Sequence, residues 1–167
     1  MATQWDDGRR GQHGRVETEE QRADRMWVDL LQELRVAQTG MQVLFGALLL
    51  AVFQPTFSRL GETDRALYIS TVIVGACSVG LLISPVSLHR VVAGRRIKPQ
   101  AVNVASWMAR LGLVLLAATT VLVLLLLMRL AINDAVAAWL AFGVGSWLVL
   151  LWLILPLWAV RHYADRR

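Results

Sequence analysis

The amino-acid sequence predicts an all-α protein, a four-helix transmembrane bundle with an N-terminal amphipathic interfacial helix. The first observation is composition: 56% of the 167 residues are hydrophobic and 17% are charged, whereas soluble domains carry about 25% charged residues. The second is spacing, because charged residues and one histidine enclose four windows of 23, 23, 18 and 26 uncharged residues. A helix needs about 20 mainly apolar residues to cross a hydrocarbon core roughly 30 Å thick. The four windows therefore predict four spans in a single domain.

The chain begins with a polar segment. Residues 1–17 combine glycine and charge with little apolar content, which predicts a disordered cytoplasmic tail, and we expect no signal peptide there. Thr18 and Gln21 have the spacing of a capping box, so an amphipathic interfacial helix is predicted over 18–35. Its apolar face comprises Met26, Trp27, Leu30, Leu31 and Leu34. Two alternatives stay open: this helix lies on the membrane, or it runs straight into the first span.

The spans make up a transmembrane domain over 36–161, followed by a cytoplasmic tail at 162–167. Their predicted bounds are about 36–54, 66–88, 111–130 and 135–160. Small residues at four-residue spacing in the second span, where another helix could approach closely, and a glycine in the fourth are assigned to helix packing: Ala76, Gly80, Ser84 and Gly143. The third span is dominated by leucine and valine, so it is expected to face lipid most.

Basic residues predict the orientation. Of the 17 Lys and Arg residues, all but Arg59, Arg65 and Arg129 fall on the side of the two termini. By the positive-inside rule both termini are cytoplasmic, in the cell (inner) membrane. The excess positive charge then reflects topology rather than nucleic-acid binding. Anionic lipid headgroups are the expected partner, contacted by His89, Arg90, Arg95, Arg96 and Lys98.

A polar region where the first span begins is the candidate functional site. It comprises Glu33, Arg35, Gln38, Thr39 and Gln42. All but the first share a helical arc of about 100°, which should not face lipid. One interpretation is hydrogen bonding between helices, with Gln38 and Gln42 bonded to the second span near Ser84 and Ser87. The other is a polar mouth at which Arg35 contacts an anion or headgroup.

The sequence offers little for catalysis. His, Cys and acidic residues show no metal-ligand spacing, and phosphate-binding loops, nucleophile elbows and paired carboxylates are absent. We expect no metal, no cofactor and no enzymatic activity. The leading hypothesis is a non-enzymatic accessory or scaffold protein that associates with itself or with another membrane protein. The alternative is a small transporter of the cation–proton antiporter kind, although the spans contain no Asp or Glu.

Three segments resemble the motifs of a family of small uncharacterised bacterial four-span membrane proteins. They are "DLLQELRVAQTGMQVLFG", "FQPTF" followed by "DRALY", and "SPVSLHR". The resemblance covers about 26–161, and some relatives carry a sodium–proton antiporter label. It supplies no catalytic or binding residues, but it implies a bacterial membrane and a pattern that includes Glu33, Arg35, Gln38, Gln42, Gln54, Pro85, His89 and Arg90.

Overall fold

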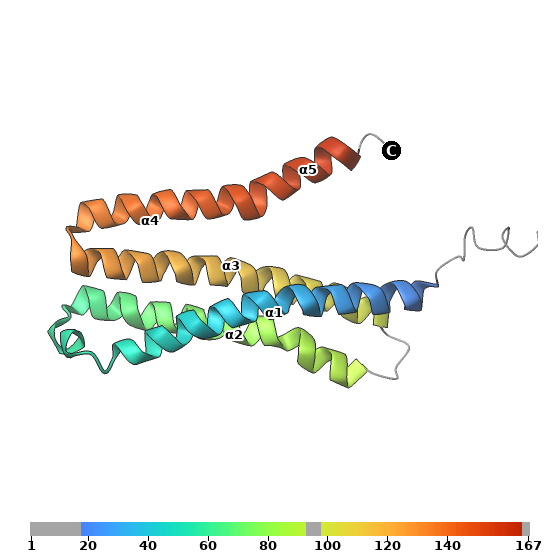
Figure 1. Ribbon diagram of the computed structural model, residues 1–167, viewed down its shortest axis with the longest axis horizontal. Helices are drawn as coiled ribbons and strands as arrows, with labels where there is room; N and C mark the ends of the chain where they lie inside the picture. The colour runs from blue at the N-terminus through green and yellow to red at the C-terminus, as the bar shows by residue number, and fades with distance from the viewer. Residues whose placement is uncertain (1–17, 93–97, 165–167) are drawn as a thin grey trace, which may run out of the picture.

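The computed structural model describes residues 18–92 and 98–164, and every element in these ranges is helical. The elements are α1 (Glu19–Ala51), η1 (Pro55–Arg59), α2 (Glu62–Val92), α3 (Lys98–Ala131), α4 (Asp134–Val149), the π-helical turn η2 (Leu150–Ile154) and α5 (Leu155–Ala164). Four helices, with α4, η2 and α5 as one, are long and apolar enough to cross a membrane. They run antiparallel to their neighbours in sequence (Figure 1). The predicted fold class is confirmed: the chain is a multi-span membrane protein.

Both ends of the described chain lie at one end of the bundle (Figure 1). The start of α1, the end of α2, the start of α3 and the end of α5 are found there. We call this the basic end, because most of the Lys and Arg residues that the structure describes belong to it. The opposite end holds η1 and the short turn between α3 and α4.

Helix α1 begins with the predicted capping box. The N–H of Gln21 donates to Thr18 Oγ1 at 3.2 Å, and the N–H of Thr18 donates to Gln21 Oε1 at 3.1 Å. From there α1 continues for 33 residues without a break. Of the two alternatives for 18–35, the structure therefore has the one in which the helix runs into the first span. On its apolar face Trp27 and Leu34 are buried, whereas Met26 is exposed.

Helices α1, α2 and α3 pack with the spacing of a coiled coil. Their buried residues are separated by three, four or seven positions, with Ala101 beside the series as a further buried residue. The series are Ala23, Trp27, Leu34, Met41 and Leu48; Tyr68, Thr71, Gly75, Ser78, Leu82, Pro85 and Val92; and Val102, Ala105, Ala109, Gly112, Thr119 and Leu126. Such a repeat keeps one seam of each helix facing its partners.

The third span is the central helix of the bundle. Helix α3 packs against α1, α2 and α4, so the expectation that it faces lipid most is wrong. The fourth helix faces lipid most, since only 6% of its 18-residue apolar stretch is buried, against 17% of the corresponding stretch of α3. The physical reason lies in the first half of α3, where Ala105, Ala109 and Gly112 let α1 and α2 approach closely.

The closest helix contacts use glycines that the sequence analysis did not single out. A Cβ on Gly112 would lie 2.9 Å from Leu82 Cδ2, and one on Gly75 would lie 3.1 Å from Phe45 Cδ2. By contrast, a Cβ on Gly80 or Gly143 would meet nothing within 4 Å. Ala76 is exposed as well, and the Ser84 hydroxyl donates to the Gly80 carbonyl of its own helix. The predicted packing stripe therefore faces away from the other described helices of this chain.

Three helices are longer than a bilayer is thick. At 31 to 34 residues each, α1, α2 and α3 are about 46–51 Å long, against a hydrocarbon core of roughly 30 Å. Arg110 and Arg129 on α3 are about 28 Å apart, so they mark the two boundaries. Lys98 then lies about 18 Å beyond Arg110. We call the projecting parts, residues 19–34, 89–92 and 98–109, the stalk.

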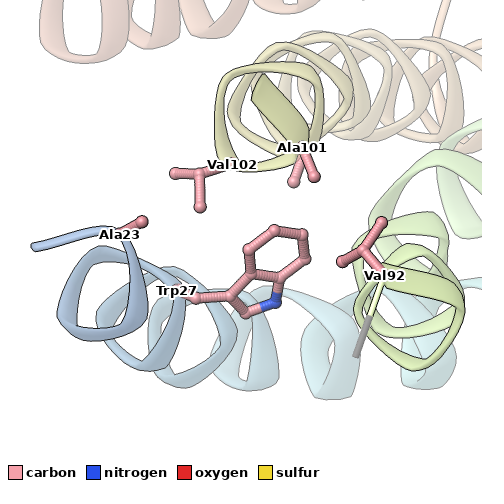
Figure 2. Packing of buried hydrophobic residues seen from close by; sticks show 6 residues of the cluster. Ala23, Trp27, Val92, Ala101 and Val102 are labelled. Atoms are coloured by element: carbon pink, nitrogen blue, oxygen red, sulfur yellow. The ribbon is translucent and has the colours of Figure 1, made fainter. Parts of the chain in front are cut away.

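The stalk has its own apolar core (Figure 2). Trp27 of α1 inserts between α2 and α3, where Val92, Ala101 and Val102 surround its ring. Since these residues project beyond the length that a hydrocarbon core covers, we expect the hydrophobic effect to stabilise this cluster. Between helices inside lipid that driving force is absent, and packing and hydrogen bonds replace it.

Candidate functional site

The five residues of the predicted polar site do not form one cluster. Glu33, Arg35, Thr39 and Gln42 are exposed, and Gln38 is half-buried against α2. The Thr39 hydroxyl donates to the Arg35 carbonyl of its own helix at 2.9 Å. Only Gln38 makes a hydrogen bond to another described helix, so the polar arc divides into an inward residue and an exposed flank.

Gln38 binds the backbone of α2. Its side-chain Nε2 donates to the Leu82 carbonyl at 2.7 Å. The acceptor lies three residues before Pro85, which is buried inside α2. Proline has no N–H for the carbonyl four residues earlier, that of Leu81, and disturbs this turn, so Gln38 binds the carbonyl next to the one that Pro85 leaves without a donor. The prediction that Gln38 turns inward onto the second span is confirmed, but Ser84 and Ser87 are not its partners.

Gln42 lies one turn from Gln38 but is exposed. The two amides border a cavity of about 10 Å³, which is completed by Met41, Val79, Leu82 and Ile83. That volume holds about one water molecule. No hydrogen bond joins Gln42 to another helix in 18–92 or 98–164, so its predicted inward bond is not found. Its amide lies about 10 Å along α1 from Arg35, at a depth where lipid surrounds the bundle.

Two more hydrogen bonds join a side chain to the backbone of another helix. The Tyr68 hydroxyl donates to the Leu48 carbonyl at 2.8 Å, and the buried Ser78 hydroxyl donates to the Gly112 carbonyl at 2.9 Å. With the Gln38 bond, they tie α2 to α1 and α3 at three depths. Tyr68 and Ser78 are not among the site residues predicted from the sequence, although both lie in the three-and-four spacing of the α2 seam.

An ionic cluster closes the opposite end of the bundle. Arg129 Nε of α3 donates to Asp64 Oδ1 of α2 at 2.7 Å, and Arg129 Nη2 lies 3.3 Å from Asp134 Oδ2 of α4. Asp64 is largely covered, with 22% of its side chain exposed, whereas Asp134 is 70% exposed. The Asp64 pair therefore contributes more than the Asp134 pair, which water screens. The sequence does contain a signal for this cluster, because Asp64, Arg129 and Asp134 lie at the ends of consecutive antiparallel spans and carry opposite charges.

The residues predicted to contact headgroups fall in different places. His89 and Arg90 are exposed on α2, and the His89 ring centroid lies 5.1 Å from that of Trp27. Arg95 and Arg96 lie outside the described residues. Lys98 begins α3 at the far end of the stalk, beyond the few ångströms that a headgroup layer adds to each side of the hydrocarbon core.

The described residues offer interhelical hydrogen bonding rather than a reaction centre. Within 18–92 and 98–164, no group of three or more His, Cys, Asp or Glu side chains converges on a point. The polar atoms of Gln38, Tyr68 and Ser78 are used between helices. In the described spans the exposed amide of Gln42 has no hydrogen bond to another helix, so it remains available to a partner.

Replacing Gln38 tests the hydrogen bond to α2. We expect Gln38→Leu to lower the free energy of unfolding by roughly 0.6–1 kcal/mol, as for other hydrogen bonds between transmembrane helices. The measurement is unfolding of the monomer in mixed micelles with increasing sodium dodecyl sulfate. Gln42→Leu is the matched control, because the same change is made one turn away on an exposed side chain. Equal losses for the two variants would contradict the assignment.

The comparisons with known proteins agree with the architecture. The model of a family of unknown function, DUF6328, matches residues 16–156, a range that includes the first three spans, most of the fourth and the polar residues of α1. No curated protein and no solved structure matches the chain. Because the family model covers most of the sequence, the protein, with its four candidate membrane spans, belongs to DUF6328, a family of unknown function.

Proposed function

We propose that this protein is a non-enzymatic membrane scaffold that associates with itself through an exposed face of α1 and α2. Gln42 carries the proposal. An amide left without a partner in hydrocarbon costs several kcal/mol, and Gln42 is exposed at that depth. A partner that supplies a donor and an acceptor would remove this cost.

Small residues adjoin Gln42 on both helices. Gln42 and Ile83 border the same cavity, and from there Gly46 on α1 and Gly80 and Ala76 on α2 follow toward the opposite end. We call these five residues the Gln42 face. A Cβ on Gly46 or Gly80 would meet nothing within 4 Å, so the backbone there is accessible to another helix. Close approach at small residues is the usual basis of association between transmembrane helices.

A second copy of the chain is the partner that best fits this face. A glutamine amide both donates and accepts, so two Gln42 side chains can pair across a twofold axis. Such an interface brings the same surface of each subunit together. The scaffold has both termini in the cytoplasm, because that orientation puts the basic end on the side that the positive-inside rule requires.

The single cysteine provides the experiment. Cys77 is exposed on α2, next to Ala76, so oxidation or a short bismaleimide should crosslink two copies in the membrane. Gln42→Leu should lower the association constant about tenfold, since a hydrogen bond between transmembrane helices contributes about 1–2 kcal/mol in model peptides. Gly80→Leu should also block association. Cys77→Ser identifies nonspecific bands, and Gln32→Leu makes the control change on an exposed stalk position.

Crosslinking that is equal in the wild type and in Gln42→Leu would refute the proposed face. A chain that stays monomeric at every protein-to-lipid ratio would refute self-association altogether.

A small transporter with Glu33, Arg35 and the two glutamines at its mouth is the alternative. It has less support, since these side chains do not converge and the adjoining cavity measures about 10 Å³. Ion flux in proteoliposomes above that of empty vesicles, and lost in Glu33→Gln, would favour the transporter.

A further inference from the structure

A second feature of the bundle lies away from the Gln42 face, where the fourth helix leaves α3. In the first half of the fourth helix, Ala137 and Ala141 are buried against α3, and a Cβ on Gly145 would lie 3.5 Å from Val121 Cγ2. From Ser146 to His162 no residue is buried. Figure 1 shows α4 and α5 moving away from α3 toward the basic end.

The sequence of this helix explains the separation. Alanine and glycine in the first half allow close packing on α3, whereas the second half presents bulky residues such as Trp152. Pro156 then removes the N–H for the Trp152 carbonyl. The helix forms a π-helical turn here, in which the Leu155 N–H donates to the Leu150 carbonyl. Turns of this kind often occur at functional sites.

The separation leaves a groove between α3 and the α4–η2–α5 helix. Its volume is about 1530 Å³, and its lining is almost entirely apolar, including Leu113, Ala117 and Val121 on one side and Trp152 and Leu157 on the other. Pockets for drug-sized molecules measure about 300–1,000 Å³. The groove is therefore large enough for a lipid.

One cation stands at the end of this groove. Arg110 lines it at the membrane boundary of the basic end. Its Nε donates to the Ser106 carbonyl at 3.2 Å, and no ion pair involves Arg110 in the parts of the chain that the structure describes. A guanidinium with free N–H groups at a lipid–water boundary matches a phosphate in charge and geometry.

The groove is long enough to cover an acyl chain of one leaflet. Its lining on α3 extends from Arg110 to Leu125, about 22 Å along the helix axis. One leaflet contributes about half of a roughly 30 Å hydrocarbon core. An acyl chain whose phosphate binds Arg110 would thus be covered along its whole length.

We propose that the groove between α3 and α4–η2–α5 is a binding site for one anionic phospholipid from the leaflet at the basic end. Its acyl chains lie along Leu113, Ala117 and Val121, and its phosphate binds Arg110. The site does not depend on the proposed self-association. It makes the second half of the fourth helix, which has no buried residue from Ser146 to His162, a segment held in part by lipid.

The test is retention of added lipid by the full chain in native mass spectrometry. The protein in neutral detergent is titrated with phosphatidylglycerol and, separately, with phosphatidylcholine. We expect one phosphatidylglycerol per chain to be retained in preference. Arg110→Gln should weaken its binding about tenfold, as expected for loss of hydrogen bonds to a charged group. Ala117→Phe should displace it with Arg110 intact.

Arg90→Gln is the matched control, because it removes an exposed arginine at the basic end that does not line the groove. Equal retention of the two lipids, or equal effects of Arg110→Gln and Arg90→Gln, would overturn the proposal. So would disulfide crosslinking between copies through Trp152→Cys in a Cys77→Ser background, since a second chain would then occupy the groove.

Discussion

Gly112→Ala should lower the free energy of unfolding by about 2 kcal/mol. The new methyl group would lie 2.9 Å from two side-chain carbons of Leu82 and 3.2 Å from its backbone nitrogen, and Leu82 is fully buried. Overpacking of this kind costs roughly 1–3 kcal/mol. Separation of α2 from α3 would also stretch the bond from Ser78 to the Gly112 carbonyl. The higher helix propensity of alanine offsets up to about 1 kcal/mol of the total.

The measurement is unfolding in mixed micelles, with Gly143→Ala as the matched control. A Cβ on Gly143 meets nothing within 4 Å, so this change should leave stability unchanged or raise it by up to about 1 kcal/mol. Leu82→Val should relieve part of the cost when it is combined with Gly112→Ala. Equal stability of the two alanine variants would contradict the close approach of α2 and α3.

Trp27→Ala should open the stalk. Trp27 is 3% exposed and is the largest side chain of the stalk cluster, and removal of a buried aromatic side chain costs about 3–5 kcal/mol. Since the stalk is a projecting segment, we expect local opening rather than global unfolding. Hydrogen exchange should show the amides of residues 19–34 losing roughly a hundredfold or more of their protection, with the spans unaffected.

Two variants separate packing from hydrogen bonding at this position. The Trp27 indole N–H has no acceptor among the described residues, so Trp27→Phe loses no such bond and should cost much less than Trp27→Ala. Trp139→Ala is the control, because Trp139 is 74% exposed. Unchanged protection over 19–34 in Trp27→Ala would show that this side chain does not hold α1 against α2 and α3.

The positions of the four spans could be predicted because charge marks them. A charged side chain inside hydrocarbon is costly, so uncharged windows such as 66–88 and 111–128 reveal where lipid begins and ends. The helical cap at Thr18 could be predicted for a similar local reason, since it depends on residues three positions apart. Both features require no knowledge of which helices are neighbours.

The packing faces could not be predicted in this way, because α2 has small residues on two sides. Gly75 and Ser78 face α1 and α3, whereas Ala76 and Gly80 point away from them. Either pair permits a close helix approach, so composition does not distinguish a contact within the chain from one between chains. The seam becomes apparent only when its spacing is compared with the seams of α1 and α3.

In the polar site, too, one feature could be predicted from the sequence and another could not. The depth of Gln38 in the span predicted its inward direction, and its bond to α2 agrees. The acceptor was wrong because Ser84 uses its hydroxyl on the Gly80 carbonyl of its own helix, while the turn before Pro85 offers the Leu82 carbonyl. A serine inside a helix can satisfy itself, and spacing along the chain does not reveal this choice.

Two solvents act on this chain, because the stalk projects beyond the hydrocarbon core and the spans lie within it. Urea and guanidinium weaken apolar burial from the water side, and cooling weakens the hydrophobic effect itself. Denaturant and cooling should therefore weaken the cluster around Trp27. Contacts within lipid, such as Leu82 against Gly112, depend instead on packing and hydrogen bonds. A mild denaturant should therefore separate the three helix ends while the spans stay assembled, so that the protein melts from the basic end inward.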